Sequence, residues 1–452
     1  MSIFNGTRLT NQTFKLDDER MRRGWYSDKY FENIVMILSR IAQEGATLAD
    51  FGLSRHPALP ERDLSSVEVG NIEVEMHFYT RRPFAVVAGV DKALAMLRYG
   101  AGSYENGRFR PTWEQLQVEA VQDGAVTTYD PDWRFIQPVI RVCGRYRDFA
   151  LLETPMLGVL TRTSRIATNV YEVLKAARGK PVLFFPARFD AHEVQAADGY
   201  AYDIAVKRFV LDYRDGPPTM ISTDAQGDWW GGAGGGTVSH AAIAAFLGQT
   251  EVAVLAFARF VPPEVPRIAL VDYHNGSVDT AVRVARAMFE QWWAATQRGD
   301  EDAARYRLYA VRLDTSMALR DESVPPLGDK VLDNGVNPRL VWNVRQALDE
   351  AWRSWTLSAE AAEAAAHFCH EVKIVVSGGF NPAKIRWFEG LHVPADIYGI
   401  GTSILTNDEQ TNTDFTADIV RVRVDGEWYD IARAGRQPGE NPDLEPVDLG
   451  AL

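Results

Sequence analysis

Polar side chains stand at the ends of the short apolar runs in the second half of the chain. Five of them, with both charge signs among them, are Arg188, Asp224, Asp272, Asp314 and Ser377. Because the carboxyl ends of parallel strands carry the active site in α/β folds, we expect these side chains to share a pocket. Each residue taken singly could instead cap a helix or form a turn.

Two glycine-containing turns follow the last two apolar runs. They are Ser377-Gly378-Gly379 and Gly399-Ile400-Gly401-Thr402-Ser403. Glycine allows backbone N–H groups to approach an anion, and the helix that follows adds its positive end. Either turn alone could be a plain connection. Two of them, one strand–helix unit apart, predict a site for a phosphate monoester.

A third feature is a glycine-rich run, 231–236, which leads into a predicted helix that starts near His240. A histidine beside a flexible loop could meet a nucleotide phosphate, and neutral imidazole is a competent nucleophile near pH 7. The alternative is a loop with a surface histidine. A second group, His367, Cys369 and His370, resembles a metal cluster, but no further ligand is evident and we expect no metal there.

The elements that position these residues follow from the apolar pattern. Short strands are predicted in the second half of the chain and alternate with helices such as 278–296 and 338–355, which implies a parallel sheet, closed as a barrel or open. The strands are 181–187, 218–223, 266–272, 308–314, 373–379 and 395–401.

The two ends of the chain have a different pattern. A helix is predicted over 30–46, a strand over 72–80, and β-rich structure over 110–150. The alternating segment 414–430, with a turn at Asp425-Gly426, predicts a hairpin that rejoins this N-terminal part. The polar tail after Arg436 is expected to be loosely held.

Bulk properties exclude several classes of protein. The length of 452 residues suggests two or three domains. A formal net charge of -13 disfavours nucleic acid and anionic membranes as partners. Two cysteines cannot build a disulfide framework, which fits a reducing cytoplasm. The N-terminus lacks the apolar core of a signal peptide, and the absence of a run of 18 apolar residues predicts no membrane span.

Several motifs, in order along the chain, resemble the nicotinate phosphoribosyltransferase family. The similarity extends from about residue 20 to residue 436, and the motifs are specific in combination. They are YSDKYF (26–31), ALLETPMLGVLTRTSRIATNV (150–170), GGGTVSHA (234–241), AVRLDTS (310–316), VVSGGFNPAKI (375–385), YGIGTSI (398–404) and DFTADIV (414–420).

The resemblance implies a type II phosphoribosyltransferase. The fold would be an irregular α/β barrel at 151–404, plus an α+β domain built from 1–150 and the returning segment 405–452. The enzyme would be a homodimer or larger, with shared active sites. It would join nicotinate to 5-phosphoribosyl 1-diphosphate with Mg²⁺, and ATP hydrolysis would be coupled through a phosphohistidine.

The resemblance also implies roles for single residues. His240 matches the phosphorylated histidine, Arg312 and Asp314 match residues at the ribose and pyridine, and Arg188 matches an arginine near nicotinate and diphosphate. Tyr30 matches an aromatic residue that a partner subunit lays on the pyridine ring. The expected substrate-binding residues are Tyr30, Asp224, Thr237, Asp272 and Thr315, and the expected phosphate-binding residues are Ser377, Gly378, Gly379, Gly399, Gly401 and Thr402.

The sequence departs from the family pattern at three places. Thr315-Ser316-Met317 follows Asp314, where many members have Ser-Gly-Asp, and Phe189 stands where many have a second arginine. ARAGR (432–436) replaces a lysine-bearing stretch. Three alternatives therefore stay open: the same fold acting on nicotinamide, the same fold acting on quinolinate, or a non-catalytic barrel that binds phosphoribosyl ligands.

Overall fold

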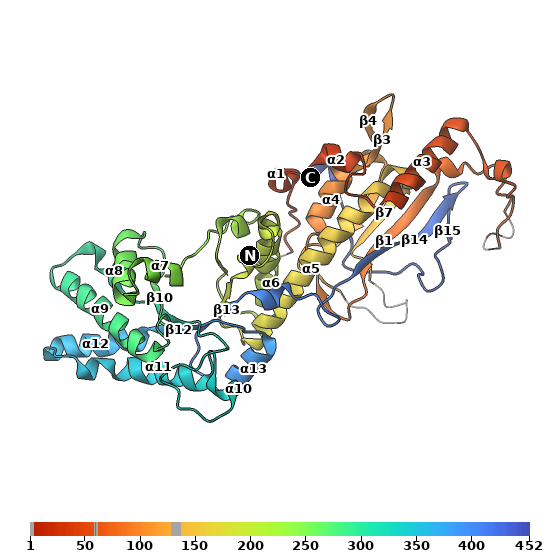
Figure 1. Ribbon diagram of the computed structural model, residues 1–452. Helices are drawn as coiled ribbons and strands as arrows, with labels where there is room; N and C mark the ends of the chain where they lie inside the picture. The colour runs from red at the N-terminus through yellow and green to blue at the C-terminus, as the bar shows by residue number, and fades with distance from the viewer. Residues whose placement is uncertain (1–3, 58, 60–61, 128–136) are drawn as a thin grey trace. The chain divides into compact units, whose positions relative to one another are not determined.

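The computed structural model describes residues 4–57, 59, 62–127 and 137–452, which fold into two compact units (Figure 1). The first unit consists of Met1–Thr168, Ala201–Asp212 and Thr406–Leu452, and the second of Asn169–Tyr200 and Tyr213–Leu405. The second unit therefore begins inside helix α5 (Glu153–Ala176), beyond the expected start at residue 151. Part of helix α6 (Gln195–Tyr213) belongs to the first unit.

The first unit is built on a six-stranded antiparallel sheet with strand order β15-β14-β1-β7-β5-β16. Two two-stranded sheets, β2-β6 and β3-β4, accompany it. The strands are β1 (Glu73–Thr80), β2 (Ala85–Val86), β3 (Gly102–Glu105), β4 (Arg108–Pro111), β5 (Gln117–Ala120), β6 (Val126–Thr127), β7 (Ile140–Arg145), β14 (Phe415–Val424), β15 (Glu427–Asp430) and β16 (Glu445–Pro446). The helices that lie wholly in this unit are α1 (Asn11–Phe14), α2 (Asp18–Arg22), α3 (Lys29–Glu44) and α4 (Val90–Gly100).

Strand β1 shows why this sheet forms. Its alternate residues Val74, Met76 and Phe78 enter the hydrophobic core of the unit, so Glu75 and His77 face the other side of the sheet. These two polar side chains are buried and lie 2.7 Å apart, and Glu75 also pairs with an arginine of β14. β1 pairs with both β7 and β14, which confirms that the C-terminal hairpin rejoins the N-terminal part.

Two local expectations in this unit were wrong. The tail after Arg436 is anchored, because β16 pairs with β5 and the apolar side chains of Leu449 and Leu452 enter the core. The β-rich stretch also ends earlier than expected. After β7 the chain turns into short 3₁₀ helices, Tyr146–Asp148 and Ala150–Leu152, which lead into α5.

The second unit is an irregular α/β barrel. Its six parallel strands have the order β10-β11-β12-β13-β8-β9, and each lies within a predicted strand. The strands are β8 (Val182–Phe184), β9 (Met220–Ile221), β10 (Ile268–Leu270), β11 (Ala310–Leu313), β12 (Lys373–Val376) and β13 (Ile397–Ile400). The helices are α7 (His240–Ala245), α8 (Thr250–Phe260), α9 (Ser277–Gln297), α10 (Lys330–Asp333), α11 (Pro338–Ala351), α12 (Ala359–Glu371) and α13 (Pro382–Gly390).

The segment 231–238, which contains the glycine-rich run, lies between the two edge strands of this sheet, β9 and β10. Gly235 N–H donates to the carbonyl of Ile221 in β9, and Val238 N–H donates to the carbonyl of Ile268 in β10. The segment thus occupies the position of a seventh strand, although it forms fewer backbone hydrogen bonds than a regular strand would. On the outside, α9 packs against α8, α11 and α12 (Figure 1).

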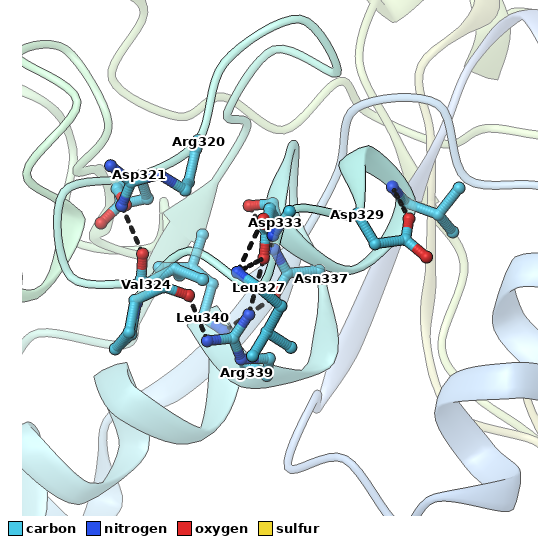
Figure 2. Close-up of polar contacts among 12 residues, drawn as sticks. Arg320, Asp321, Val324, Leu327, Asp329, Asp333, Asn337, Arg339 and Leu340 are labelled. Atoms are coloured by element: carbon cyan, nitrogen blue, oxygen red, sulfur yellow. Dashed lines mark hydrogen bonds and ion pairs between the residues drawn. The ribbon is translucent and has the colours of Figure 1, made fainter.

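The connection from β11 to α11 is fixed by its own polar contacts (Figure 2). The buried carboxylate of Asp333 accepts the N–H groups of Leu327 and Gly328 and pairs with Arg339 at 2.9 Å. This network holds the connection in one shape although it carries several exposed apolar residues. Asn337 then caps α11 by accepting the N–H of Leu340.

The structure therefore confirms the predicted fold class, an irregular (β/α) barrel plus an α+β domain made from both chain ends. Among the described residues, no helix combines the length and the apolar character that crossing a bilayer requires.

Candidate active site

A cavity of about 350 Å³ lies in the second unit, beyond the carboxyl ends of the parallel strands. Most of the residues predicted at strand ends and glycine turns line it together. The lining residues are Phe185, Ala187, Arg188, Phe189, Ser222, Arg312, Asp314, Ser377, Gly378, Gly379, Phe380, Gly399, Gly401 and Thr402. The cavity is within the size range of small-molecule sites.

Arg312 is held in one orientation by three side chains. Its Nε donates to Ser377 Oγ at 3.0 Å, one terminal nitrogen donates to Thr237 Oγ1 at 3.1 Å, and the other pairs with Asp314 at 2.8 Å. The guanidinium lies 5.3 Å from the centre of the Phe185 ring. A cation restrained in this way loses little entropy when it binds an anion.

Arg188 is the second cation of the cavity and is differently placed. It ends a short 3₁₀ turn after β8, is exposed, and stacks on Phe189 with 5.2 Å between the guanidinium carbon and the ring centre. Within residues 4–57, 59, 62–127 and 137–452, no carboxylate forms an ion pair with it. Its charge is therefore available to a ligand.

Three aromatic side chains of the cavity were not predicted as site residues: Phe185, Phe189 and Phe380. Phe189 lies over Gly401, where an added Cβ would stand 2.6 Å from its ring. Phe185 follows strand β8 directly, in the same position as the polar residues at other strand ends, whereas Phe380 follows the glycine turn after β12. The position directly after a strand could therefore have indicated Phe185 as a site residue. An apolar residue in that position is, however, also typical of the strand itself or of the core.

The two glycine turns meet in this cavity, as predicted. Gly378 and Gly379 both have positive φ, 85° and 71°, which side-chain-bearing residues rarely adopt. An added Cβ on Gly399 would stand 3.0 Å from the Cβ of Ser377. Bare backbone therefore lines one wall and can approach an anion closely.

His240 begins helix α7, with Ser239 as its N-cap. Its side chain is half exposed, and Nε2 lies 3.2 Å from Oδ1 and 3.3 Å from Oδ2 of Asp272. The Asp272 side chain is only 6% exposed. Burial raises the pKa of this carboxyl, an effect that His240 opposes. Neither residue lines the cavity described above, and both come from the barrel unit.

Three other predicted residues have different surroundings. Asp224 accepts the N–H of Gly234 at 2.9 Å and so fixes the glycine-rich segment. Thr237 is connected to the cavity through its hydrogen bond to Arg312. Thr315 is buried, and its hydroxyl has no hydrogen-bond partner among the described residues. Their roles in substrate binding stay predictions.

Tyr30 belongs to the first unit. It lies in the first turn of α3, is 61% exposed, and donates from its hydroxyl to Asp28 at 3.2 Å. Its predicted place on a ligand of a neighbouring subunit stays a prediction. In the group considered as a metal cluster, His367 lies near Glu371 and His370 near Asp349. In the described part of the chain, no group of three or more His, Cys, Asp or Glu could hold a metal ion.

Comparison with known proteins gave one family model and several solved structures. Residues 63–164 match the model of the quinolinate phosphoribosyl transferase N-terminal domain. The nicotinate-nucleotide pyrophosphorylase from Pyrococcus furiosus is 23% identical with a TM-score of 0.63, and the alignment covers 96% of this chain and 85% of that one. Human nicotinic acid phosphoribosyltransferase is 15% identical with a TM-score of 0.55, covering 88% of this chain and 74% of that one. No curated protein sequence matches.

These findings confirm the resemblance drawn from the motifs. The family model covers strands of the antiparallel sheet, and both solved structures share the fold over most of this chain. The chain therefore shares the fold of these phosphoribosyltransferase structures, and its residues 63–164 are similar to the N-terminal domain of quinolinate phosphoribosyltransferases.

Proposed function

We propose that this chain is a phosphoribosyltransferase that joins nicotinate to 5-phosphoribosyl 1-diphosphate, giving nicotinate mononucleotide and diphosphate. The observation that carries the proposal is the pairing, in one cavity, of an unpaired guanidinium at Arg188 with bare backbone at the two glycine turns. The guanidinium suits a ring carboxylate and the backbone suits a phosphate.

The walls of the cavity favour a flat ring with one negative charge. Phe185, which is half-buried, offers aromatic surface, and stacking there would add about 0.5–1.5 kcal/mol beyond area burial. Arg312 forms an ion pair with Asp314, whereas Arg188 forms none with the described carboxylates, so Arg188 is the better placed of the two cations for the ring carboxylate. A pyridine that carries two carboxylates would leave one of them without a cation.

In the proposed reaction the pyridine nitrogen forms a bond to the ribose C1 while the bond from C1 to the diphosphate oxygen breaks. The transition state resembles an oxocarbenium ion, so the enzyme acts mainly by positioning and by neutralising charge. Arg312, held by three side chains, is suited to positioning the anionic groups of the substrate because it needs no reorganisation during the reaction. The glycine turns would hold the 5-phosphate.

The leaving diphosphate calls for Mg²⁺, and the carboxylates near the cavity fit such an ion. Asp272 Oδ1 is buried and receives no hydrogen bond from the described residues, and the charge of Asp314 is close enough to act on Asp272. Oxygen donors of this kind suit a hard cation. Asp272 and Asp314 would hold the ion together with the diphosphate, where it would neutralise the departing charge.

ATP would enter this scheme through His240. With Asp272 accepting a proton held on Nε2, the lone pair lies on Nδ1, which can attack the γ-phosphorus of ATP and release ADP. Water would later cleave the N–P bond and release phosphate. A phosphoryl group on this segment would change the charge beside the barrel mouth, which gives ATP a physical route to favour product formation.

The proposed assembly is a homodimer or larger, with Tyr30 of one subunit stacked on the ring bound by another. The support is that Tyr30 is an exposed aromatic residue in the unit that does not contain the cavity.

One observation favours a second candidate, a quinolinate phosphoribosyltransferase, because residues 63–164 match the N-terminal domain of that family. That reaction would release CO₂ and would have no need of ATP. Assays with nicotinate, nicotinamide and quinolinate, each with and without ATP, separate the possibilities. The proposal requires nicotinate mononucleotide from nicotinate, with ATP raising the yield. Product and CO₂ from quinolinate alone would replace it with the second candidate, and no product from any base would refute both.

A further inference from the structure

A second cavity, of about 400 Å³, lies at the opposite ends of the same strands, where β10, β11 and β12 begin. Its walls include Arg307 and Tyr309 from the start of β11, Lys373 at the start of β12, and Phe368 from α12. The candidate active site lies at the other end of β11, beyond Arg312. At roughly 3.3 Å per residue, Tyr309 and Arg312 are separated by about 10 Å along the strand.

The charge of this second cavity is positive. Three of its lining residues are cations, Arg267, Arg307 and Lys373, and one is a carboxylate, Glu371. Glu371 pairs with Arg307 at 3.1 Å. In the part of the chain that the structure describes, no carboxylate forms an ion pair with either of the other two cations.

Arg267 contributes charge without being a free donor. It is 3% exposed, and both terminal nitrogens donate to backbone carbonyls around the end of α8, among them those of Ala258 and Val261. Its Nε donates to the carbonyl of Arg305. A guanidinium stays protonated even when buried. Its positive charge therefore acts on whatever occupies the cavity.

Lys373 is the donor that remains available. Its side chain is exposed and its Nζ lies 3.3 Å from the hydroxyl of Tyr309 and 4.7 Å from the centre of that ring. A single neutral partner leaves two of the three ammonium N–H groups for a ligand.

The remaining walls are apolar and partly aromatic. The Tyr309 ring is half-buried, Phe368 is 3% exposed, and Pro263, Val265 and Pro266 complete the lining. Aromatic walls favour a flat ring, and the volume is in the range of small-molecule sites.

We propose that this cavity binds an aromatic anion, that is, a flat ring carrying one carboxylate or one phosphate, with Lys373 as the donor to the anionic group and Tyr309 against the ring. The site is separate from the proposed active site and does not depend on the proposed reaction. Free aromatic acids and aromatic phosphate esters share this chemistry.

Calorimetric titration of the full chain tests the site with three probes of one ring system: 2-naphthoate, 2-naphthyl phosphate and 2-naphthol at pH 7. At least one of the anions should bind, and the neutral naphthol should bind roughly tenfold more weakly, because it lacks the charged hydrogen bond. The anion that binds more tightly shows whether the natural ligand is a free aromatic acid or an aromatic phosphate ester. Naphthol binding as tightly as both anions would overturn the role of charge.

Variants locate the binding. Lys373→Gln should weaken binding of the tighter anion roughly tenfold. Lys330→Gln, a matched change of an exposed lysine on α10, should leave it unchanged. Arg188→Gln in the candidate active site should also leave it unchanged. Binding that survives Lys373→Gln at full strength, or that disappears with Arg188→Gln, would overturn the proposal and assign the anion to the first cavity.

A second pair of variants tests the ring. Tyr309→Phe keeps the aromatic wall and should bind the same anion within about twofold, whereas Tyr309→Ala should bind it several-fold more weakly. Equal binding by both variants would show that the ring wall is not used, which contradicts the proposal. Unfolding temperatures of all variants show whether the fold is kept.

Discussion

His240 and Asp272 form a pair that joins the start of α7 to the end of β10, with Nε2 3.2 Å from the carboxylate. The histidine is half exposed while the carboxylate is almost fully buried. An arrangement of this kind restrains the orientation of the imidazole through Nε2. It brings together two residues that are 32 positions apart in the sequence.

The first prediction concerns this histidine. His240→Ala should abolish ATP hydrolysis stimulated by nicotinate and 5-phosphoribosyl 1-diphosphate, and should leave slow synthesis of the mononucleotide without ATP. Labelled γ-phosphate should appear on the wild-type protein as an acid-labile, base-stable adduct. His274→Ala is the matched control, because His274 is exposed in the same unit and its ring is hydrogen-bonded to a backbone carbonyl, that of Gly248. If the His240 variant kept full ATP coupling, the phosphohistidine hypothesis would be wrong, and His240 would only be the first residue of α7.

The second prediction concerns the choice of base. Wild-type enzyme should use nicotinate at least roughly tenfold better than nicotinamide, since one charged hydrogen bond contributes about 1.5–3 kcal/mol. Arg188→Gln should reduce this preference, measured as the ratio of kcat/KM values. Arg298→Gln, at the end of α9, should not change it. Equal kcat/KM values of the wild type for the two bases would contradict the proposal that Arg188 binds the ring carboxylate.

The third prediction concerns assembly. Tyr30→Ala and Arg312→Ala should each be nearly inactive as pure proteins and should regain activity when subunits are exchanged. The reason is that a mixed dimer contains one site with both residues intact. Activity is measured after subunit exchange has been verified by mass. Failure of complementation would indicate sites completed within one subunit.

The fourth prediction concerns pH. Burial, together with the negative charges of Asp418 and Asp28, raises the pKa of the Glu153 carboxyl to about 8. The folded state therefore keeps a proton that the unfolded state releases near its ordinary pKa of 4.5. This contribution to the free energy of unfolding is complete below pH 4.5 and is lost between pH 4.5 and 8, by up to about 1.4 kcal/mol per pH unit.

Glu153→Gln removes this loss. Relative to wild type, the variant should therefore gain stability as the pH rises from 4.5 to 8. Urea denaturation at pH 5 and pH 8 measures the difference. Glu172→Gln, on an outer position of the same helix, serves as the control and should show no such trend. A Glu153→Gln effect that is the same at both pH values would contradict an unusual pKa.

The fifth prediction concerns the connection between β11 and α11 (Figure 2). Asp333→Ala should lower the free energy of unfolding by about 2–4 kcal/mol, because it leaves Arg339 and two backbone N–H groups without their acceptor. Asp329→Ala removes only an exposed N-cap bond to Val331 and should cost about 1 kcal/mol. Chemical denaturation of both variants makes the comparison. Equal losses would mean that the Asp333 network adds nothing beyond a cap.

The sequence by itself determined the strands and helices of the barrel, because their apolar periodicity is a local property. It also located Arg188, Asp314, Ser377 and the glycine turns at strand ends, since the carboxyl edge of a parallel sheet collects such residues. The return of the C-terminal hairpin to the N-terminal part could also be predicted from the sequence. Its residues alternate between apolar and polar, and such a strand needs a partner sheet whose core covers the apolar face.

Only the tertiary structure decided which distant residues face one another. Phe185 and Phe380 line the cavity, Asp272 faces His240, and the glycine-rich segment closes the barrel between β9 and β10. The apolar residues of the tail, Leu449 and Leu452, are anchored in the core although their segment reads as polar. Such pairings depend on how packed elements fill space around a shared core, and no local pattern of residues encodes the direction in which a side chain meets its partner.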